Sequence, residues 1–210
     1  MSKQKIIFVA GLHGNERMPV EALTENGIRF ILGNPRAYEK NTRYTKKDLN
    51  ASFGVDHKDY ECVRAKEILN EISGGALVVD FHTTASDAQP FVIVVDEKML
   101  PLAGRTGIER VVIMRHNIKN GHALINHRSG ISVEAGTHKN RSSYQTTLGV
   151  VRNVLGEKEY PVVLYEAYDE IKEPGDYKTF QMHADGFIPI LSNEPEYESQ
   201  GLFGLKARRL

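Results

Sequence analysis

Short apolar runs alternate with longer amphipathic segments along most of the chain. Apolar runs of strand length lie at residues 5–11, 28–33, 76–81, 91–95, 111–114 and 131–133. Three other segments have the character of helices, and each is followed by glycine: residues 16–26, 57–73 and 141–155. Because apolar strands alternate with helices, this pattern predicts an α/β fold whose mixed or parallel sheet is covered on both faces.

Two regions depart from the alternation. Residues 34–56 form a long polar stretch, which we expect to be a loop, and loops of this length are usually functional or disordered. After Gly156, a strand-like segment at residues 161–168 is followed by short segments rich in glycine and proline. We therefore predict a catalytic domain over residues 1–157 and a small, β-rich C-terminal subdomain over residues 158–210.

The composition is that of an ordinary globular protein, and it argues against several classes. The 210 residues include 27 Lys+Arg and 27 Asp+Glu, so no basic excess suggests binding to nucleic acid. The single cysteine, Cys62, rules out an internal disulfide and a multi-cysteine metal site. No apolar run approaches the roughly 20 residues that span a bilayer, and the first run is too short for a signal peptide. We expect a cytoplasmic protein with no nucleic-acid or membrane partner, either monomeric or a homo-oligomer.

Candidate catalytic residues follow the predicted strands at their carboxyl ends, where ligands bind in such sheets. His13 and Glu16 follow the first strand, His82 follows the third, and Glu134 ends the sixth. Two histidines and one carboxylate make a three-ligand catalytic zinc site that leaves a fourth position for water. We therefore predict one Zn²⁺ per chain, held by His13, Glu16 and His82.

The same chemistry needs two further groups. A separate glutamate has to take a proton from water and pass it to the leaving nitrogen, and Glu134 is the candidate. The oxyanion that forms requires a positive group besides zinc, and Arg43 in the long polar stretch is the candidate. Each residue taken alone also has a structural explanation: a hydrogen-bonded strand-end histidine for His82, or a helix-capping carboxylate for Glu134. The zinc hypothesis is stronger because its signals occur at three different strand ends.

Four sequence motifs, in their order and spacing, resemble the succinylglutamate desuccinylase/aspartoacylase family of the zinc carboxypeptidase-like superfamily. The motifs are GLHGNE at residues 11–16, NPRA at 34–37 with TRY at 42–44 and DLN at 48–50, DFHTT at 80–84, and VEAG at 133–136. The resemblance implies a three-layer α/β/α sandwich with a largely parallel sheet and a smaller β-rich C-terminal part. It also implies zinc on the three ligands predicted above.

The resemblance further assigns roles to individual residues. It implies that Glu134 activates water and that Arg43 polarises the scissile carbonyl. It implies that Asp48 shapes the site and that Asn50 contacts a substrate carboxylate. Near the end of the chain, the segment 193–197 looks like the family segment that delivers a substrate-binding tyrosine, which would be Tyr197.

Departures from the family pattern concern the substrate. Family members usually have an arginine after the asparagine of DLN, where this chain has Ala51. They also have an arginine about ten residues before the catalytic glutamate, where this chain has Leu124. Neither side chain can make the bidentate contact of a guanidinium with a carboxylate. Arg128, or its neighbour His127, is the nearby candidate to replace the missing arginines in substrate binding.

The sequence therefore favours a zinc-dependent amidohydrolase that cleaves an N-acyl amino acid or a small peptide-like substrate. A carboxypeptidase-like or esterase activity is an alternative. A second alternative is a non-catalytic, zinc-binding regulatory relative, although a pure binder has no need for Glu134. The third is an α/β domain without metal, in which the motifs arose by coincidence.

Overall fold

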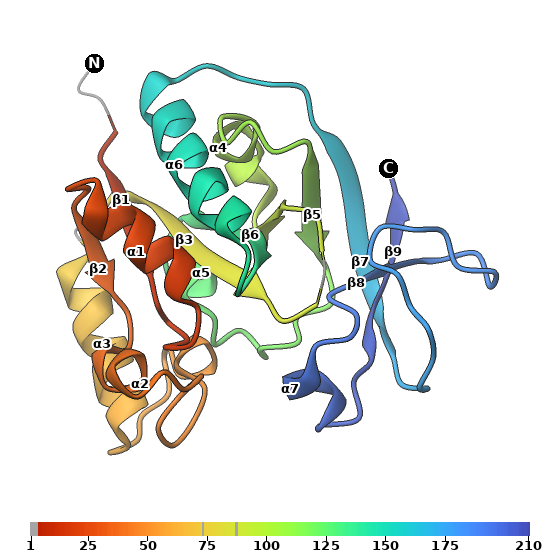
Figure 1. The fold of residues 1–210 in the computed structure, drawn as a ribbon, viewed down its shortest axis with the longest axis horizontal. Helices are drawn as coiled ribbons and strands as arrows, with labels where there is room; N and C mark the ends of the chain where they lie inside the picture. Colours follow the sequence, from red (N-terminus) through yellow and green to blue (C-terminus); the bar gives the residue numbers. More distant parts are fainter. Residues whose placement is uncertain (1–3, 73, 87) are drawn as a thin grey trace.

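The computed structural model describes residues 4–72, 74–86 and 88–210, which are organised around one sheet (Figure 1). Within this part of the chain, the sheet has nine strands in the order β2-β1-β3-β6-β4-β5-β7-β9-β8. In chain order they are β1 (Ile6–Ala10), β2 (Phe30–Leu32), β3 (Leu77–Thr84), β4 (Phe91–Val94), β5 (Arg110–Met114), β6 (Gly130–Thr137), β7 (Val163–Ile171), β8 (Ile188–Ile190) and β9 (Gly204–Arg209).

Strand directions confirm the predicted mixed, largely parallel sheet. The first four strands in spatial order, β2, β1, β3 and β6, are parallel to one another. β4 runs antiparallel to β6, and β5 and β7 are parallel to β4. The last two strands pair antiparallel, β9 with β7 and β8 with β9. The carboxyl ends of β1, β3 and β6 therefore meet at one edge, where the predicted site residues lie.

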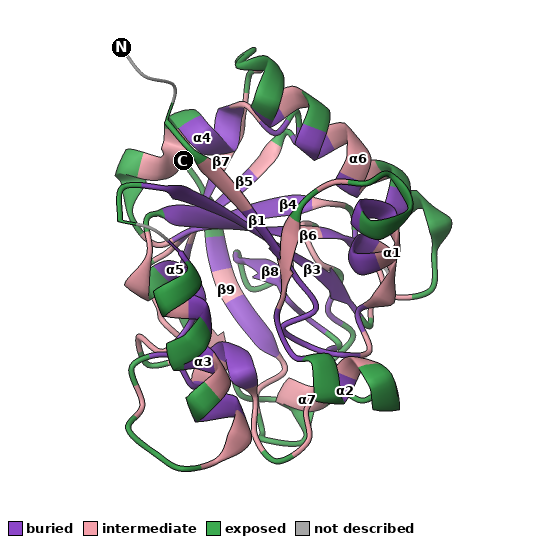
Figure 2. Ribbon diagram, turned by 90° about the vertical axis from the view of Figure 1, so that its left-hand side faces the viewer, coloured by how far each residue is buried: buried purple, intermediate pink, exposed green. Residues whose placement is uncertain are grey.

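Helices cover both faces of the sheet, and Figure 2 shows the resulting layers. On one face lie α1 (Arg17–Glu25), α4 (Leu100–Gly104) and α6 (Arg141–Gly156), whose buried residues share a core with the central strands. On the other face lie α3 (Tyr60–Glu71) and α5 (Leu124–His127). The three-layer α/β/α arrangement is thus confirmed.

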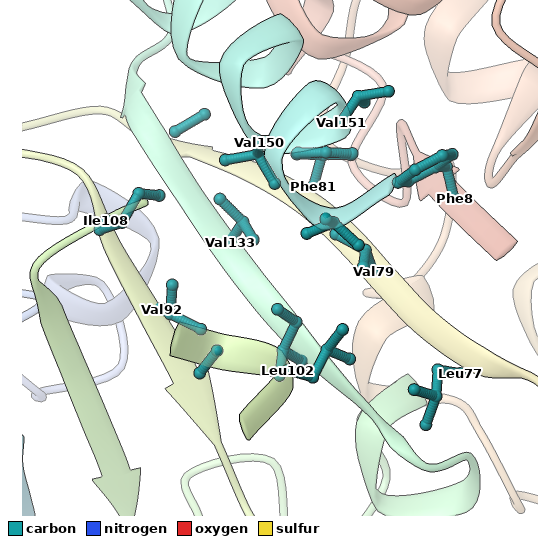
Figure 3. Packing of buried hydrophobic residues seen from close by; sticks show 14 of the residues in the cluster. Phe8, Leu77, Val79, Phe81, Val92, Leu102, Ile108, Val133, Val150 and Val151 are labelled. Atoms are coloured by element: carbon teal, nitrogen blue, oxygen red, sulfur yellow. The ribbon is translucent and has the colours of Figure 1, made fainter. Parts of the chain in front are cut away.

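Alternation of side chains along the strands separates the two cores. In β1, Phe8 belongs to the core under α1 and α6, whereas its neighbour Val9 belongs to the core under α3. Figure 3 shows Val150 and Val151 of α6 close to Phe81 of β3 in the first core. Central strands that are buried on both faces read as continuous apolar runs, which explains why the sequence pattern identified them.

Several short elements were not predicted from the sequence. The polar stretch 34–56 contains α2 (Pro35–Lys40) and a 3₁₀ turn, η1 (Leu49–Ala51). α2 forms because the side chain of Asn34 accepts a hydrogen bond from the backbone of Ala37 and proline occupies the first turn. Further short helices are η2 (Glu97–Met99), α4, α5 and α7 (Pro195–Glu198).

The C-terminal strands continue the sheet of the preceding residues. β7 pairs with β5 from Arg110–Val163 to Met114–Ala167, and β9 and β8 extend the same edge. A core cluster on this side combines residues of β4 and β5 with residues of β7, β8 and β9. Hydrogen bonds and packing thus join the two parts in one sheet, and the division of the chain at residue 157 stays a prediction. In the described ranges, no helix has the length and apolar character needed to cross a membrane.

Leu23 tests the packing of α1 on the sheet. Its side chain is fully buried in the core under α1 and α6, so Leu23→Ala leaves a cavity. We expect a loss of about 2–5 kcal/mol in the free energy of unfolding, measured by urea denaturation. Leu155 of α6 is 54% exposed, and Leu155→Ala is the matched control with an expected change of at most about 0.5 kcal/mol. Equal losses in both variants would contradict this packing.

Candidate metal and catalytic site

The side chains of His13, Glu16 and His82 meet at the carboxyl ends of β1 and β3. One possible ligand atom from each lies within 4.8 Å of the others, and all three residues are buried. Nδ1 of His13 lies 2.6 Å from Oε1 of Glu16, and Nδ1 of His82 lies 3.1 Å from Oε2 of the same carboxylate. The structure thus brings together the three residues that the sequence predicts as metal ligands.

The turn after β1 depends on two glycines. Gly11 has φ +71°, a left-handed conformation that residues with a Cβ seldom adopt. A Cβ on Gly14 would clash with the backbone carbonyl of Ala37, so only glycine lets the turn pass this close to α2. These two glycines allow the side chains of His13 and Glu16, three positions apart in the sequence, to point at the same spot.

The outer nitrogen of each histidine ring contacts a second carboxylate. Nε2 of His13 lies 2.9 Å from Oδ1 of Asp48, and Nε2 of His82 lies 2.8 Å from Oδ2 of Asp80. Histidines that bind metals usually have a carboxylate, a backbone carbonyl or a water on the ring nitrogen that does not bind the metal. Both Nδ1 atoms, in contrast, face the carboxylate of Glu16. Two imidazole nitrogens and one carboxylate form a donor set that fits a divalent ion such as zinc.

The charge of the site supports the same fit. Burial by itself raises the pKa of Glu16, but the attraction of the His13 and His82 rings outweighs it and holds this pKa well below its usual range. The pKa of Asp48 is also held low, against its burial, by His13, Lys119 and Arg43. Glu16 is therefore ionised at neutral pH and can neutralise part of the charge of a bound cation.

Glu134 lies beside this group on the neighbouring strand. It is directly opposite His82 in the pairing of β3 with β6, and both residues line one pocket. Its Oε2 atom is buried and has no hydrogen-bond partner among the described residues. Burial is the main cause that raises the pKa of the Glu134 carboxyl to about 8; the charge of His82 opposes this rise, and that of Glu16 adds to it. A pKa near neutrality and an uncommitted oxygen suit a group that exchanges protons.

Arg43 and Asn50 also line the pocket. Nη2 of Arg43 lies 3.5 Å from Oδ2 of Asp48, and Nε of Arg43 is buried without a partner in the described part of the chain. The carbonyl of Arg43 accepts a hydrogen bond from the backbone of Gly14, which fixes this loop to the turn after β1. Asn50 is held by the backbone N–H of Leu124, which donates to its Oδ1 atom at 3.1 Å.

A buried carboxylate holds the loop that carries Arg43 and Asp48. Oε1 of Glu61, in α3, accepts hydrogen bonds from the backbone and the hydroxyl of Thr45 at 2.8 and 2.6 Å. It also accepts from the backbone of Lys46 at 3.3 Å and from the side chain of Asn34 at 3.4 Å. Glu61 therefore positions the loop without lining the pocket itself.

Sequence comparison identifies the family to which these residues belong. The model of the "Succinylglutamate desuccinylase/Aspartoacylase catalytic domain" matches residues 2–148. The chain belongs to this family. The match spans the motifs that carry the resemblance found in the sequence, from GLHGNE to VEAG.

Individual relatives agree with this assignment. A probable aspartoacylase from Prochlorococcus marinus (strain MIT 9301) is 39% identical over 110 residues, covering 41% of this chain and 36% of the relative. A succinylglutamate desuccinylase from Pseudoalteromonas atlantica is 36% identical over 87 residues, covering 32% of this chain and 25% of the relative. The alignments therefore span about a third of the first of these curated relatives and a quarter of the second.

Solved structures of other proteins share the fold over nearly the whole chain. The succinylglutamate desuccinylase from Chromobacterium violaceum has a TM-score of 0.76 at 21% identity, covering 99% of this chain and 85% of that one. Murine aminoacylase 3 has a TM-score of 0.75 at 17% identity, covering 100% of this chain and 96% of that one. At these identities, the likeness establishes the fold.

The residues expected to bind substrate fall into two groups. Tyr197 and Asn50 line the pocket, whereas Asp48 does not line it and contacts Nε2 of His13. Arg128 does not reach the pocket: its guanidinium donates to the backbone carbonyls of Leu69 and His127, at 2.6 and 2.8 Å. The structure therefore does not support Arg128 as a substrate-binding residue, because its side chain turns toward the end of α3.

Three functional candidates were not assigned from the sequence. Asp80 stands two residues before His82 on β3, a spacing that places both side chains on one face and could have indicated the contact. Lys119 lines the pocket from the segment between β5 and α5 and donates to Asp48 Oδ2 at 2.7 Å. Glu194 also lines the pocket and accepts hydrogen bonds from the backbone of Ala85 and Ser86. No sequence pattern marked Lys119. Glu194 lies in the segment 193–197, for which the resemblance implied a role for Tyr197 only.

Glu61→Gln tests whether the carboxylate in α3 holds the loop of Arg43. Replacing the charged acceptor by an amide should cost about 1.5–3 kcal/mol of unfolding free energy, because several hydrogen bonds to a charged group are weakened. Hydrogen exchange at the amides of Thr45 and Lys46 should also become faster. The matched control is Glu67→Gln, an exposed residue on the same helix, with an expected change below about 0.5 kcal/mol. Unchanged exchange at both amides would contradict the anchoring role.

Proposed function

We propose that the chain is a zinc-dependent hydrolase that cleaves the amide bond of an N-acyl amino acid or a small peptide-like substrate. The observation that carries the proposal is one pocket that combines His13, Glu16 and His82 with the buried carboxyl of Glu134. Family membership supports it, since relatives are named aspartoacylase and succinylglutamate desuccinylase. Because the alignments cover only part of those relatives, the reaction and the substrate of this chain are proposed here.

In this proposal, the Nδ1 atoms of His13 and His82 and the carboxylate of Glu16 would hold one zinc ion. When bound, the ion supplies a Lewis acid that polarises a carbonyl and makes water more acidic. Asp48 and Asp80 act on the outer ring nitrogens, where they keep each imidazole oriented and raise its basicity as a ligand.

Glu134 acts as the proton carrier of the reaction. Its carboxylate takes a proton from the attacking water as the new C–O bond forms, and then passes a proton to the nitrogen as the C–N bond breaks. The unpartnered Oε2 atom leaves it free for both transfers. The guanidinium of Arg43 stabilises the negative charge that develops on the carbonyl oxygen. Asn50 and Tyr197 contribute to holding the substrate in the same pocket.

Metal content tests the ligand assignment. The purified, zinc-equilibrated protein should contain about one zinc per chain, measured by inductively coupled plasma mass spectrometry after gel filtration. His13→Ala should lose most of this metal, because two ligands bind zinc far more weakly than three. His57→Ala is the control, since His57 is exposed and its ring contacts Asp59 rather than the pocket. Equal zinc in wild type and His13→Ala would remove His13 from the site.

Glu134→Gln tests the proton carrier. The variant should keep its zinc but lose hydrolysis by about 10²–10⁴-fold, because an amide cannot accept the proton of water. The substrate is chosen by screening N-acyl amino acids and dipeptides with the wild type, and Glu109→Gln, an exposed position, is the control. Unchanged turnover would exclude Glu134 from the mechanism. A wild type that binds zinc but hydrolyses none of these compounds would instead favour the regulatory alternative.

A further inference from the structure

Cationic side chains in the pocket are few. Among the described residues that line it, the lysines and arginines are Arg43 and Lys119. The two positions at which the family pattern led us to expect arginine add no charge. Ala51 ends η1 and does not line the pocket, and Leu124 is fully buried in the core under α3. Ile125 in α5 and Ala123, directly before α5, line the pocket, but both are apolar.

Lys119 is placed to bind a ligand. Its side chain is only 15% exposed, and its Nζ atom lies 5.0 Å from the ring centre of Tyr197. Among the described residues, its hydrogen-bond acceptor is Oδ2 of Asp48 at 2.7 Å. An ammonium group has three N–H donors, so two stay available for a ligand in the pocket.

The charges around Lys119 match a ligand with one carboxylate. Asp48 lies between Arg43 and Lys119 and neutralises one of these two cations, so the three side chains together carry a net charge of about +1. Two further carboxylates, those of Glu194 and Glu196, line the same pocket. A second carboxylate on the ligand would therefore meet no free cation and would be repelled by these residues.

One part of the pocket wall is apolar. It is formed by side chains that belong to or pack against the core of the C-terminal strands: Ile93, Val95, Met114, Ile118 and Leu191. Apolar atoms gain free energy when they leave water for such a surface, whereas a charged or polar group would lose its hydration there without a partner.

We infer that the pocket binds N-acyl amino acids that have a single carboxylate and an apolar side chain. Lys119 binds the carboxylate of the ligand. The side chain of the ligand lies against the apolar wall formed by Ile93, Val95, Met114, Ile118 and Leu191. This inference rests on the proposed function and adds the substrate class to it. Lys119 acts here in specificity and not in bond cleavage, so its loss should weaken binding and leave the chemical step largely intact.

Binding is measured separately from turnover, with zinc-loaded Glu134→Gln protein and isothermal titration calorimetry. The probes are N-acetyl-L-leucine, N-acetyl-L-aspartate and N-acetyl-L-leucinamide, which lacks the carboxylate. N-acetyl-L-leucine should bind at least tenfold more tightly than each of the other two. Because this comparison uses one protein, it does not depend on whether further variants fold.

Variants identify the residues responsible. Added to the same background, Lys119→Met should lower the affinity for N-acetyl-L-leucine at least tenfold and leave the affinity for N-acetyl-L-leucinamide within about twofold of its value. Lys119→Arg should retain most of the affinity for N-acetyl-L-leucine. Lys98→Met, an exposed lysine outside the pocket, is the matched control and should change neither. Ile118→Asn should lower the affinity for N-acetyl-L-leucine but not the affinity for N-acetylglycine, which has no side chain.

The outcomes separate this inference from the proposed function. Tighter binding of N-acetyl-L-aspartate, or an equal effect of Lys119→Met on both leucine compounds, would overturn the inference even if the wild type hydrolyses amides. The expected order of binding, combined with no hydrolysis by the wild type, would support the inference on the pocket and overturn the proposed function.

Discussion

The structure depends on the burial of one carboxylate between two histidines. Glu16 is 1% exposed, and His13 and His82 are 4% and 3% exposed, so none of the three can rely on water to stabilise its charge. Ionisable groups at such depth are costly unless each has a partner of opposite charge or a metal ion. Asp48 and Asp80 supply partners on the outer side of the rings, and the inner side, with both Nδ1 atoms, faces Glu16. This constraint fixes the orientation of both imidazoles.

The parallel sheet makes this cluster possible. β1, β3 and β6 are neighbours that point the same way, so residues from three distant parts of the chain reach one edge. The pairing of β3 with β6 sets His82 opposite Glu134, and the glycine-dependent turn after β1 brings His13 and Glu16 to the same place.

The sequence predicted those parts of the fold and of the site that depend on local pattern. Apolar strands, amphipathic helices and the histidines and glutamates at strand ends are all visible without a structure, because strand ends in such sheets have a known role. The short helix α2 was missed because a capping asparagine and a proline, rather than apolar spacing, determine it. Contacts that join distant segments were missed as well. Lys119 meets Asp48 across 71 residues of sequence, and Arg128 donates to the carbonyl of Leu69 in α3 and to that of His127. Only tertiary packing decides which of two basic residues near each other in sequence enters a pocket.

The most direct test of the account is the position of the metal itself, measured by anomalous diffraction at the zinc edge from crystals of the zinc-loaded protein. We predict one strong peak per chain, about 2.0–2.2 Å from Nδ1 of His13, Nδ1 of His82 and a carboxylate oxygen of Glu16. Asp48 and Asp80 should stay on the Nε2 atoms. A peak at bonding distance from Nε2 of either histidine, a peak elsewhere in the molecule, or no peak at all would contradict the proposed zinc site.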